Sequence, residues 1–183
     1  MKGIAKAAQG DRVSQEGLIA FFQNTTRSTL VEINSETDFV GKNEKFHSFV
    51  AMVANVVNST MPSNVPIDIP ELLNQKDSNG VQTVAESLGD IVTQIRENIV
   101  IRRAMNIEMP LDSTLLSCYL HGKVGTDNTP PNMFLGKSAA VVMMKYNSST
   151  PLSDSNRQHL LESGKRLAMH VVCLFNPNIY IYS

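Results

Sequence analysis

The chain has 183 residues, of which 42% are hydrophobic, and its 16 Lys and Arg residues oppose 17 Asp and Glu residues. This composition is compatible with a packed core and excludes a largely disordered chain. The near-zero net charge gives no broad field to attract nucleic acid, and no apolar run approaches the roughly 18 residues of a membrane-spanning helix. We therefore expect a folded protein with no direct nucleic-acid or membrane partner. Two cysteines make no disulfide framework and indicate a reducing compartment.

The first part of the chain predicts a hairpin followed by a helix. Residues 15–23 and 29–34 have the alternating faces that are typical of strands, and turn-forming residues at 24–26 join them. From residue 46 onward the apolar period changes to three and four residues, which predicts a helix. Its apolar positions are Phe46, Phe49, Val50, Val53, Ala54 and Val57.

A second helix and a third strand complete this first unit. Residues 59–70 contain three of the eight prolines and predict a loop. Thr83 and Glu86 have the spacing of a capping box, so we expect a helix to begin there and to run to about Asn98. β-branched residues over 99–109 predict a strand, which Pro110 ends.

The rest of the chain predicts a second unit of similar make-up. Residues 115–124 and 138–146 predict a second hairpin, with a long loop over 125–136. A helix begins at Ser153 or Asp154 and contains Gly164, which costs about 1 kcal/mol there relative to alanine. We expect this glycine to allow the close approach of a strand. Residues 179–182 predict a short final strand.

These elements predict an α+β fold of two subdomains, each a small antiparallel sheet packed with helices. The first subdomain spans residues 14–111 and the second spans 112–175.

Asp38 and Phe39 lie side by side where the second strand gives way to the first helix. The preceding residues, Ser35 to Asp38, are typical of turns and helix caps. Such a corner is exposed and is held by backbone on both sides, so packing alone does not favour a phenylalanine there. The structural alternative is an Asp38 that caps the helix and a Phe39 that packs on it.

The segment VEINSETDFV at 31–40, followed by Asn43, Glu44 and Phe46, resembles the signature of the translation elongation factor Ts family. In the second unit, YLHGKVG at 119–125 and GKRLAMHVV at 164–172 resemble a strand and a helix of the same family. The resemblance covers roughly residues 3–172. It implies that residues 1–13 are the remnant of a linker helix, that the second subdomain is incomplete, and that 176–183 are a variant tail. The second-unit segments resemble mitochondrial members, which implies a mitochondrial location.

The resemblance also implies a function without covalent catalysis or a cofactor: guanine-nucleotide exchange on the GTPase elongation factor Tu. In the family, the pair that matches Asp38 and Phe39 contacts the GTPase near its nucleotide and magnesium. A phenylalanine wedged there shifts magnesium ligands by about an ångström, which degrades an octahedral site. Linkage then requires the tightest binding to the nucleotide-free GTPase. The implied contact residues are Glu36, Thr37, Asp38, Phe39, Val40 and Asn43, with His121, Gly122 and His170 in the second subdomain.

Two other classes of function stay open. One is a shortened interaction module that binds the GTPase or another protein without accelerating nucleotide release. The other is a metal-binding protein, because zinc prefers four ligands of the kind offered by Cys118, His121, His170 and Cys173. Cys118 and His121 are three apart on an expected strand and so point to opposite faces, which disfavours the metal site.

Overall fold

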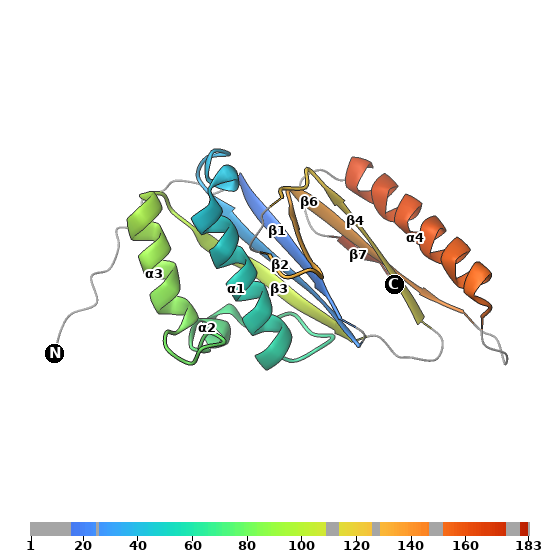
Figure 1. The fold of residues 1–183 in the computed structure, drawn as a ribbon, viewed down its shortest axis with the longest axis horizontal. Coiled ribbons are helices and arrows are strands. Elements are labelled where there is room, and N and C mark those ends of the chain that lie inside the picture. Colours follow the sequence, from blue (N-terminus) through green and yellow to red (C-terminus); the bar gives the residue numbers. More distant parts are fainter. Residues whose placement is uncertain are drawn as a thin grey trace.

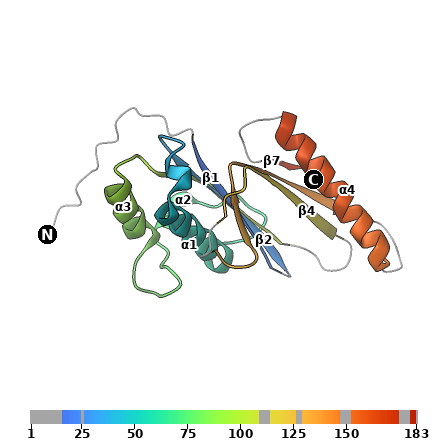
Figure 2. The same ribbon diagram turned by 45° about the horizontal axis from the view of Figure 1, so that its top comes forward.

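The computed structural model describes residues 16–24, 26–108, 114–125, 129–146, 152–174 and 180–182. Two sheets lie face to face in the middle of the molecule, with helices on both outer sides (Figure 1; Figure 2). The elements are β1 (Glu16–Gln23), β2 (Arg27–Ser35), the 3₁₀ helix η1 (Val40–Lys42), α1 (Glu44–Thr60), α2 (Ile69–Leu73), α3 (Val84–Ile95), β3 (Val100–Glu108), β4 (Thr114–His121), β5 (Met133–Gly136), β6 (Ser138–Lys145), α4 (Asp154–Leu174) and β7 (Tyr180–Tyr182). The expected α+β fold of small sheets packed with helices is confirmed. Among the described helices, none is both long and apolar enough to cross a bilayer.

The first sheet has the strand order β3-β2-β1-β5, and the second has the order β4-β6-β7. The predicted hairpin of β1 and β2 is confirmed, with Leu18 opposite Ile33. The second hairpin pairs β4 with β6, and the final strand β7 runs parallel to β6. The chain therefore returns to the first sheet only through β5, which lies between β4 and β6 in sequence.

Both faces of the β1–β2 hairpin are buried, because the first sheet lies between helices and the second sheet. One face packs on α1, whose predicted apolar positions are buried. The opposite face packs on β4 and β6 and contributes Ile19, Phe21 and Leu30 to the core between the sheets. On the far side of the second sheet, Ala168 and Val172 of α4 pack on Ala140. This four-layer arrangement buries β2 along nearly its whole length and gives the segment that follows it a rigid base.

The structure corrects two predicted loops. Residues 133–136, expected in a loop, form β5 and pair antiparallel with β1. Residues 69–73, partly expected in a loop, form α2, with Asp68 accepting a bond from the Glu71 N–H. The capping box of Thr83 and Glu86 is confirmed, and α3 ends at Ile95 because Arg96 adopts a left-handed φ of 65°. The predicted linker remnant at 1–13, Pro110, and the predicted variant tail apart from β7 lie outside the described residues.

Gly164 lies where α4 packs closely against β4 and β6 of the second sheet. A Cβ at this position would lie 2.6 Å from Ser117 Oγ and 2.5 Å from Met144 Cε. The Ser117 hydroxyl donates a hydrogen bond to Leu161 O at 2.9 Å, so the serine is itself held in place. The prediction that this glycine allows a strand to approach is confirmed.

We expect Gly164→Ala to lower the free energy of unfolding by about 1–2 kcal/mol, because overpacking outweighs a gain of roughly 1 kcal/mol in helix propensity. Gly89 is the matched control, since it lies inside α3 and a Cβ there meets no atom within 4 Å. Gly89→Ala should stabilise the protein by about 0.5–1 kcal/mol. Urea unfolding measures whether each substitution raises or lowers the free energy of unfolding. Stabilisation by both substitutions would contradict the close packing of α4.

Candidate functional site: the corner between β2 and α1

Residues 36–43, here called the β2–α1 corner, form a compact turn between the end of β2 and the start of α1. Three successive backbone hydrogen bonds close it, from Gly41 N to Asp38 O (3.2 Å), from Lys42 N to Phe39 O (3.0 Å) and from Asn43 N to Val40 O (2.9 Å). Asn43 is the N-cap of α1 and accepts a bond from Lys45 N at 2.9 Å. The interpretation of Asp38 as the cap of this helix is therefore wrong.

Phe39 projects from this corner into solvent. Its side chain is 72% exposed, whereas the next residue, Val40, is 3% exposed and packs in the core below. Lys42 Nζ lies 5.9 Å from the centre of the Phe39 ring. The alternative in which Phe39 packs on its own helix is therefore wrong. A phenylalanine held at the surface by a buried neighbour is available to a partner protein.

A second segment of the chain fastens the corner from the side. The Glu97 carboxylate, just beyond α3, accepts bonds from Thr37 N at 2.9 Å and from Thr37 Oγ1 at 2.6 Å. The corner also accepts a bond from this second segment, because Asn98 N donates to the Glu36 carboxylate at 3.0 Å. These reciprocal bonds limit the movement of the residues just before Asp38. Within the described part of the chain, Asp38 itself is exposed and its carboxylate makes no hydrogen bond or ion pair.

His47 supports the corner from below. It lies in the first turns of α1, is 5% exposed, and places Nε2 2.8 Å from Gly41 O. Because a carbonyl oxygen only accepts, Nε2 carries the proton in this arrangement. Its other ring nitrogen, Nδ1, is buried and has no hydrogen-bond partner in the structure. His47 therefore satisfies the buried carbonyl at the end of the turn that presents Phe39.

Neither His47 nor Glu97 was among the site residues predicted from the sequence. A polar residue on the buried face of α1 is a signal that could have drawn attention to His47. Nothing in the local sequence signals Glu97, because its contact with Thr37 joins residues 60 positions apart. Both act by positioning the corner and need not contact a partner.

We expect His47→Gln to keep the β2–α1 corner rigid and His47→Met to loosen it. A glutamine amide can still donate to Gly41 O, whereas methionine leaves that buried carbonyl without a donor, at a cost of about 1–3 kcal/mol. Amide hydrogen exchange at Gly41, Lys42 and Asn43, whose N–H groups close the turn, with urea unfolding as the control for folding, distinguishes the two variants. Equal rates of hydrogen exchange for the two variants would show that the hydrogen bond has no positioning role.

The second group of predicted site residues lies away from the β2–α1 corner. His121 ends β4 and is exposed, and its backbone carbonyl accepts a bond from Lys137 N at 2.8 Å. Gly122 follows with a φ of 61°, and a Cβ there would lie 3.1 Å from Lys137 Cγ. This turn therefore favours glycine for its conformation and for the space beside Lys137.

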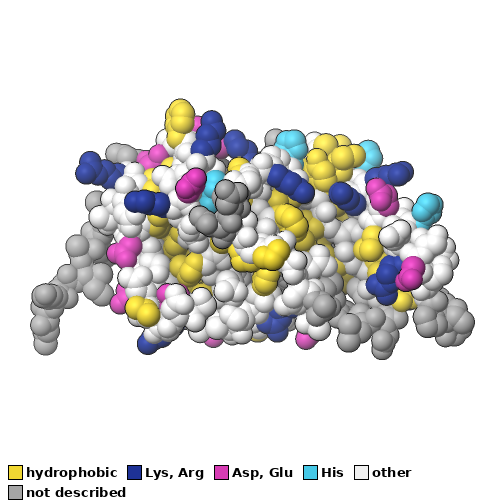
Figure 3. Space-filling view, in the orientation of Figure 1, with side chains coloured by type: hydrophobic (Ala, Val, Ile, Leu, Met, Phe, Trp, Pro, Cys, Tyr) yellow, Lys and Arg dark blue, Asp and Glu magenta, His cyan; other side chains and the backbone are white. Residues whose placement is uncertain are grey.

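His170 lies on the solvent-facing side of α4 among exposed apolar side chains. Leu167, Met169 and Leu174 are 53%, 39% and 76% exposed. Figure 3 shows apolar side chains gathered beside histidines on this side of the molecule. The β2–α1 corner and α4 lie on opposite sides of the paired sheets (Figure 1). The predicted site residues therefore form two separate surfaces.

The four residues considered for zinc do not form a metal site. Cys118 packs toward the core between the sheets while His121 is exposed, in keeping with the opposite faces predicted for them. Burial raises the pKa of the Cys118 thiol to about 12, and zinc binds the thiolate. Across the described residues, no group of three or more Cys, His, Asp or Glu side chains is arranged to hold a metal ion.

Comparison with known proteins identifies relatives of this chain. A family model described as "Elongation factor TS" matches residues 36–180. The elongation factor Ts of Rhodospirillum centenum is 35% identical over 171 residues, which are 93% of this chain and 49% of that protein. The elongation factor Ts of Bradyrhizobium diazoefficiens is 33% identical over 177 residues, which are 96% of this chain and 50% of that protein.

The chain spans about half the length of the curated relatives it matches. The matched region begins at Glu36, so it includes the whole β2–α1 corner, and it continues through α4. Together with the signature at 31–40, this match shows that the chain belongs to the elongation factor Ts family.

Proposed function

We propose that this chain is a guanine-nucleotide exchange factor that promotes GDP release from elongation factor Tu during translation elongation. The observation that carries the proposal is the exposed Phe39 on a rigid corner within the family signature. Membership of the elongation factor Ts family supports elongation factor Tu as the partner. The chain makes and breaks no covalent bond in this role, so it is not an enzyme in the chemical sense and needs no cofactor.

The geometry of the corner suits a side chain that must displace groups in a partner. Magnesium holds its ligands in a strict octahedron at about 2.0–2.1 Å, so a small shift of nearby residues weakens nucleotide binding. Phe39 can cause such a shift only if it does not yield itself. The bonds from Thr37 to Glu97 and from His47 to Gly41 provide this resistance. Asp38, exposed beside Phe39, is available to stabilise the rearranged partner.

A second contact forms where His121, Gly122 and the exposed side of α4 meet a different part of the GTPase. The apolar side chains around His170 offer the kind of surface that protein partners bury. This contact holds the two proteins together, whereas Phe39 acts on the nucleotide site. The two surfaces therefore affect different quantities: the concentration needed for exchange and the maximal rate of exchange.

Linkage provides a direct test of the proposal. If the chain weakens GDP binding by some factor, GDP must weaken the binding of the chain by the same factor. We expect the chain to bind nucleotide-free elongation factor Tu about 100-fold more tightly than the GDP-bound form, since couplings of about 1–3 kcal/mol are typical. Calorimetry with the two forms of the GTPase measures this ratio, and equal affinities would contradict the exchange function.

We further propose that the chain works in mitochondria. The resemblance of residues 119–125 and 164–172 to mitochondrial members supports this location. Nucleotide release from mitochondrial and bacterial elongation factor Tu provides the test. Faster release from the bacterial protein alone would contradict a mitochondrial role.

A further inference from the structure

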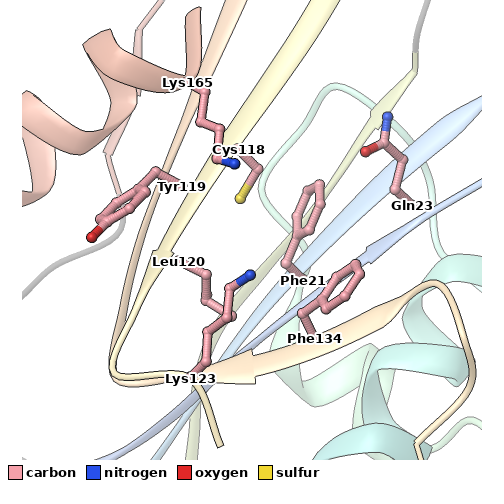
Figure 4. Close-up of a pocket in the computed structure, with 8 residues that line it drawn as sticks. All are labelled: Phe21, Gln23, Cys118, Tyr119, Leu120, Lys123, Phe134 and Lys165. Atoms are coloured by element: carbon pink, nitrogen blue, oxygen red, sulfur yellow. The ribbon is translucent and has the colours of Figure 1, made fainter. Parts of the chain in front are cut away.

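A cleft of about 390 Å³ lies between the edges of the two sheets, apart from the β2–α1 corner (Figure 4). β5 is one edge strand of the first sheet and β4 is one edge strand of the second. The side chains that matter here are Phe21, Cys118, Leu120, Lys123, Phe134 and Lys165.

The cleft has an apolar floor and an apolar rim. Phe21 and Phe134 are directly opposite each other on β1 and β5, so their side chains lie on the same face of the first sheet. The second sheet covers Phe21, which is 5% exposed, but it leaves Phe134 45% exposed. Leu120, 6% exposed, closes the floor from β4. The cleft therefore continues the core between the sheets out to solvent.

The charges in the cleft are positive. Lys123 Nζ lies 5.3 Å from the centre of the Phe134 ring. Lys165 reaches in from α4 beside Cys118 (Figure 4). No Asp or Glu is among the residues that line the cleft. Cys118 does not neutralise these lysines, because burial raises its pKa to about 12 and keeps it a thiol.

We propose that this cleft binds a segment of a partner protein in which an apolar side chain lies next to a carboxylate. The apolar side chain packs on Phe21, Leu120 and Phe134, and the carboxylate pairs with Lys123 and Lys165. An apolar anchor gives affinity, and an opposite charge at the rim gives selectivity. Lys123 follows Gly122 and Lys165 lies on α4, so the cleft adjoins the second contact proposed above. The proposal does not rest on the exchange function, because it assigns no role to Phe39 and its probes are tested without the GTPase.

The observations favour a protein segment over RNA as the occupant. Single-stranded nucleic acid requires several stacking platforms along a continuous basic track. The cleft offers one exposed phenylalanine and two lysines, on a chain whose net charge is −1.

The test uses the full chain, labelled with ¹⁵N, and two peptide probes. Acetyl-Glu-Phe-Glu-amide carries the proposed chemistry, and acetyl-Lys-Phe-Lys-amide has the same apolar group with the opposite charge. We expect the acidic probe to shift amide signals of β1, β4 and β5 and to bind about tenfold more tightly, a difference of about 1.4 kcal/mol. Equal affinities, or shifts confined to other elements, would overturn the proposal.

Variants identify the side chains that bind the probes and set the preference between them. The double change Lys123→Glu and Lys165→Glu should reverse the preference between the probes, and Phe134→Ser should weaken both. Lys76→Glu is the matched control, because Lys76 is an exposed lysine on the connection between α2 and α3, and it should leave the preference unchanged. An unchanged preference in the double variant, or displacement of the acidic probe by oligouridylate at lower concentration, would also overturn the proposal. Thermal unfolding verifies that each variant is folded.

Discussion

Phe39→Ala is expected to reduce the stimulation of GDP release by about tenfold or more at saturating concentrations of the chain. Truncation of a central aromatic contact commonly costs about 2 kcal/mol or more of interaction free energy. Phe39 is 72% exposed and packs little on the protein itself, so the free energy of unfolding should change by no more than about 0.5 kcal/mol. Stopped-flow release of a fluorescent GDP measures the first quantity, and urea unfolding measures the second.

Val81→Ala is the matched control for this change. Val81 is 75% exposed, comparable to Phe39, and lies in the connection between α2 and α3. Its truncation should leave the rate of GDP release unchanged. A Phe39→Ala protein that is folded and fully active would remove Phe39 from the mechanism and with it the role assigned to the β2–α1 corner.

Asn106→Ala is expected to give the largest loss of stability, about 3 kcal/mol. Asn106 lies on β3 and is fully buried. Its Nδ2 donates to Val57 O at 2.7 Å and to Met61 O at 3.0 Å, while Oδ1 accepts a bond from Thr29 Oγ1 at 2.6 Å. Alanine removes the side-chain donor to Met61 O and the acceptor of the Thr29 hydroxyl, whereas Val57 O keeps the bond from Met61 N. For a chain of this size the unfolding temperature should fall by roughly 6–12 °C.

Asn74→Ala is the control for this loss. Asn74 also donates to a backbone carbonyl, that of Pro70 at 3.0 Å, but the bond is exposed. Its loss should cost about 0.5 kcal/mol or less, because water replaces the donor. A stability loss below about 1 kcal/mol for Asn106→Ala would show that the hydrogen bonds of Asn106 do not anchor the end of α1.

Local sequence patterns predicted those parts of the fold that depend on residues close together in the chain. The apolar stripe of α1, the capping box at Thr83 and the turn at 24–26 each depend on residues close in sequence. The role of Gly164 was also predictable from the sequence. A glycine inside a helix lowers stability relative to alanine, and the close approach of a strand explains why it is there. The exposed position of Phe39 followed from its place between a strand and a helix.

Contacts between distant residues were not predictable in this way. β5 has four residues, too few for a pattern of its own, and its partner β1 lies more than 100 positions earlier. The Asp38 cap was wrong because η1 intervenes before α1, so that Asn43 occupies the N-cap position. The hydrogen bonds from Thr37 to Glu97 and from His47 to Gly41 also depend on tertiary packing. Tertiary packing therefore provides the rigidity of the site, whereas the local sequence signals only its location.

Stopped-flow release of fluorescent GDP from elongation factor Tu, at increasing concentrations of this chain, tests the central claim most directly. The exchange function predicts that the release rate rises with concentration and then saturates. A chain that is folded and binds the nucleotide-free GTPase, yet leaves the release rate unchanged at every concentration, would contradict it. That result would identify the chain as the non-exchanging interaction module.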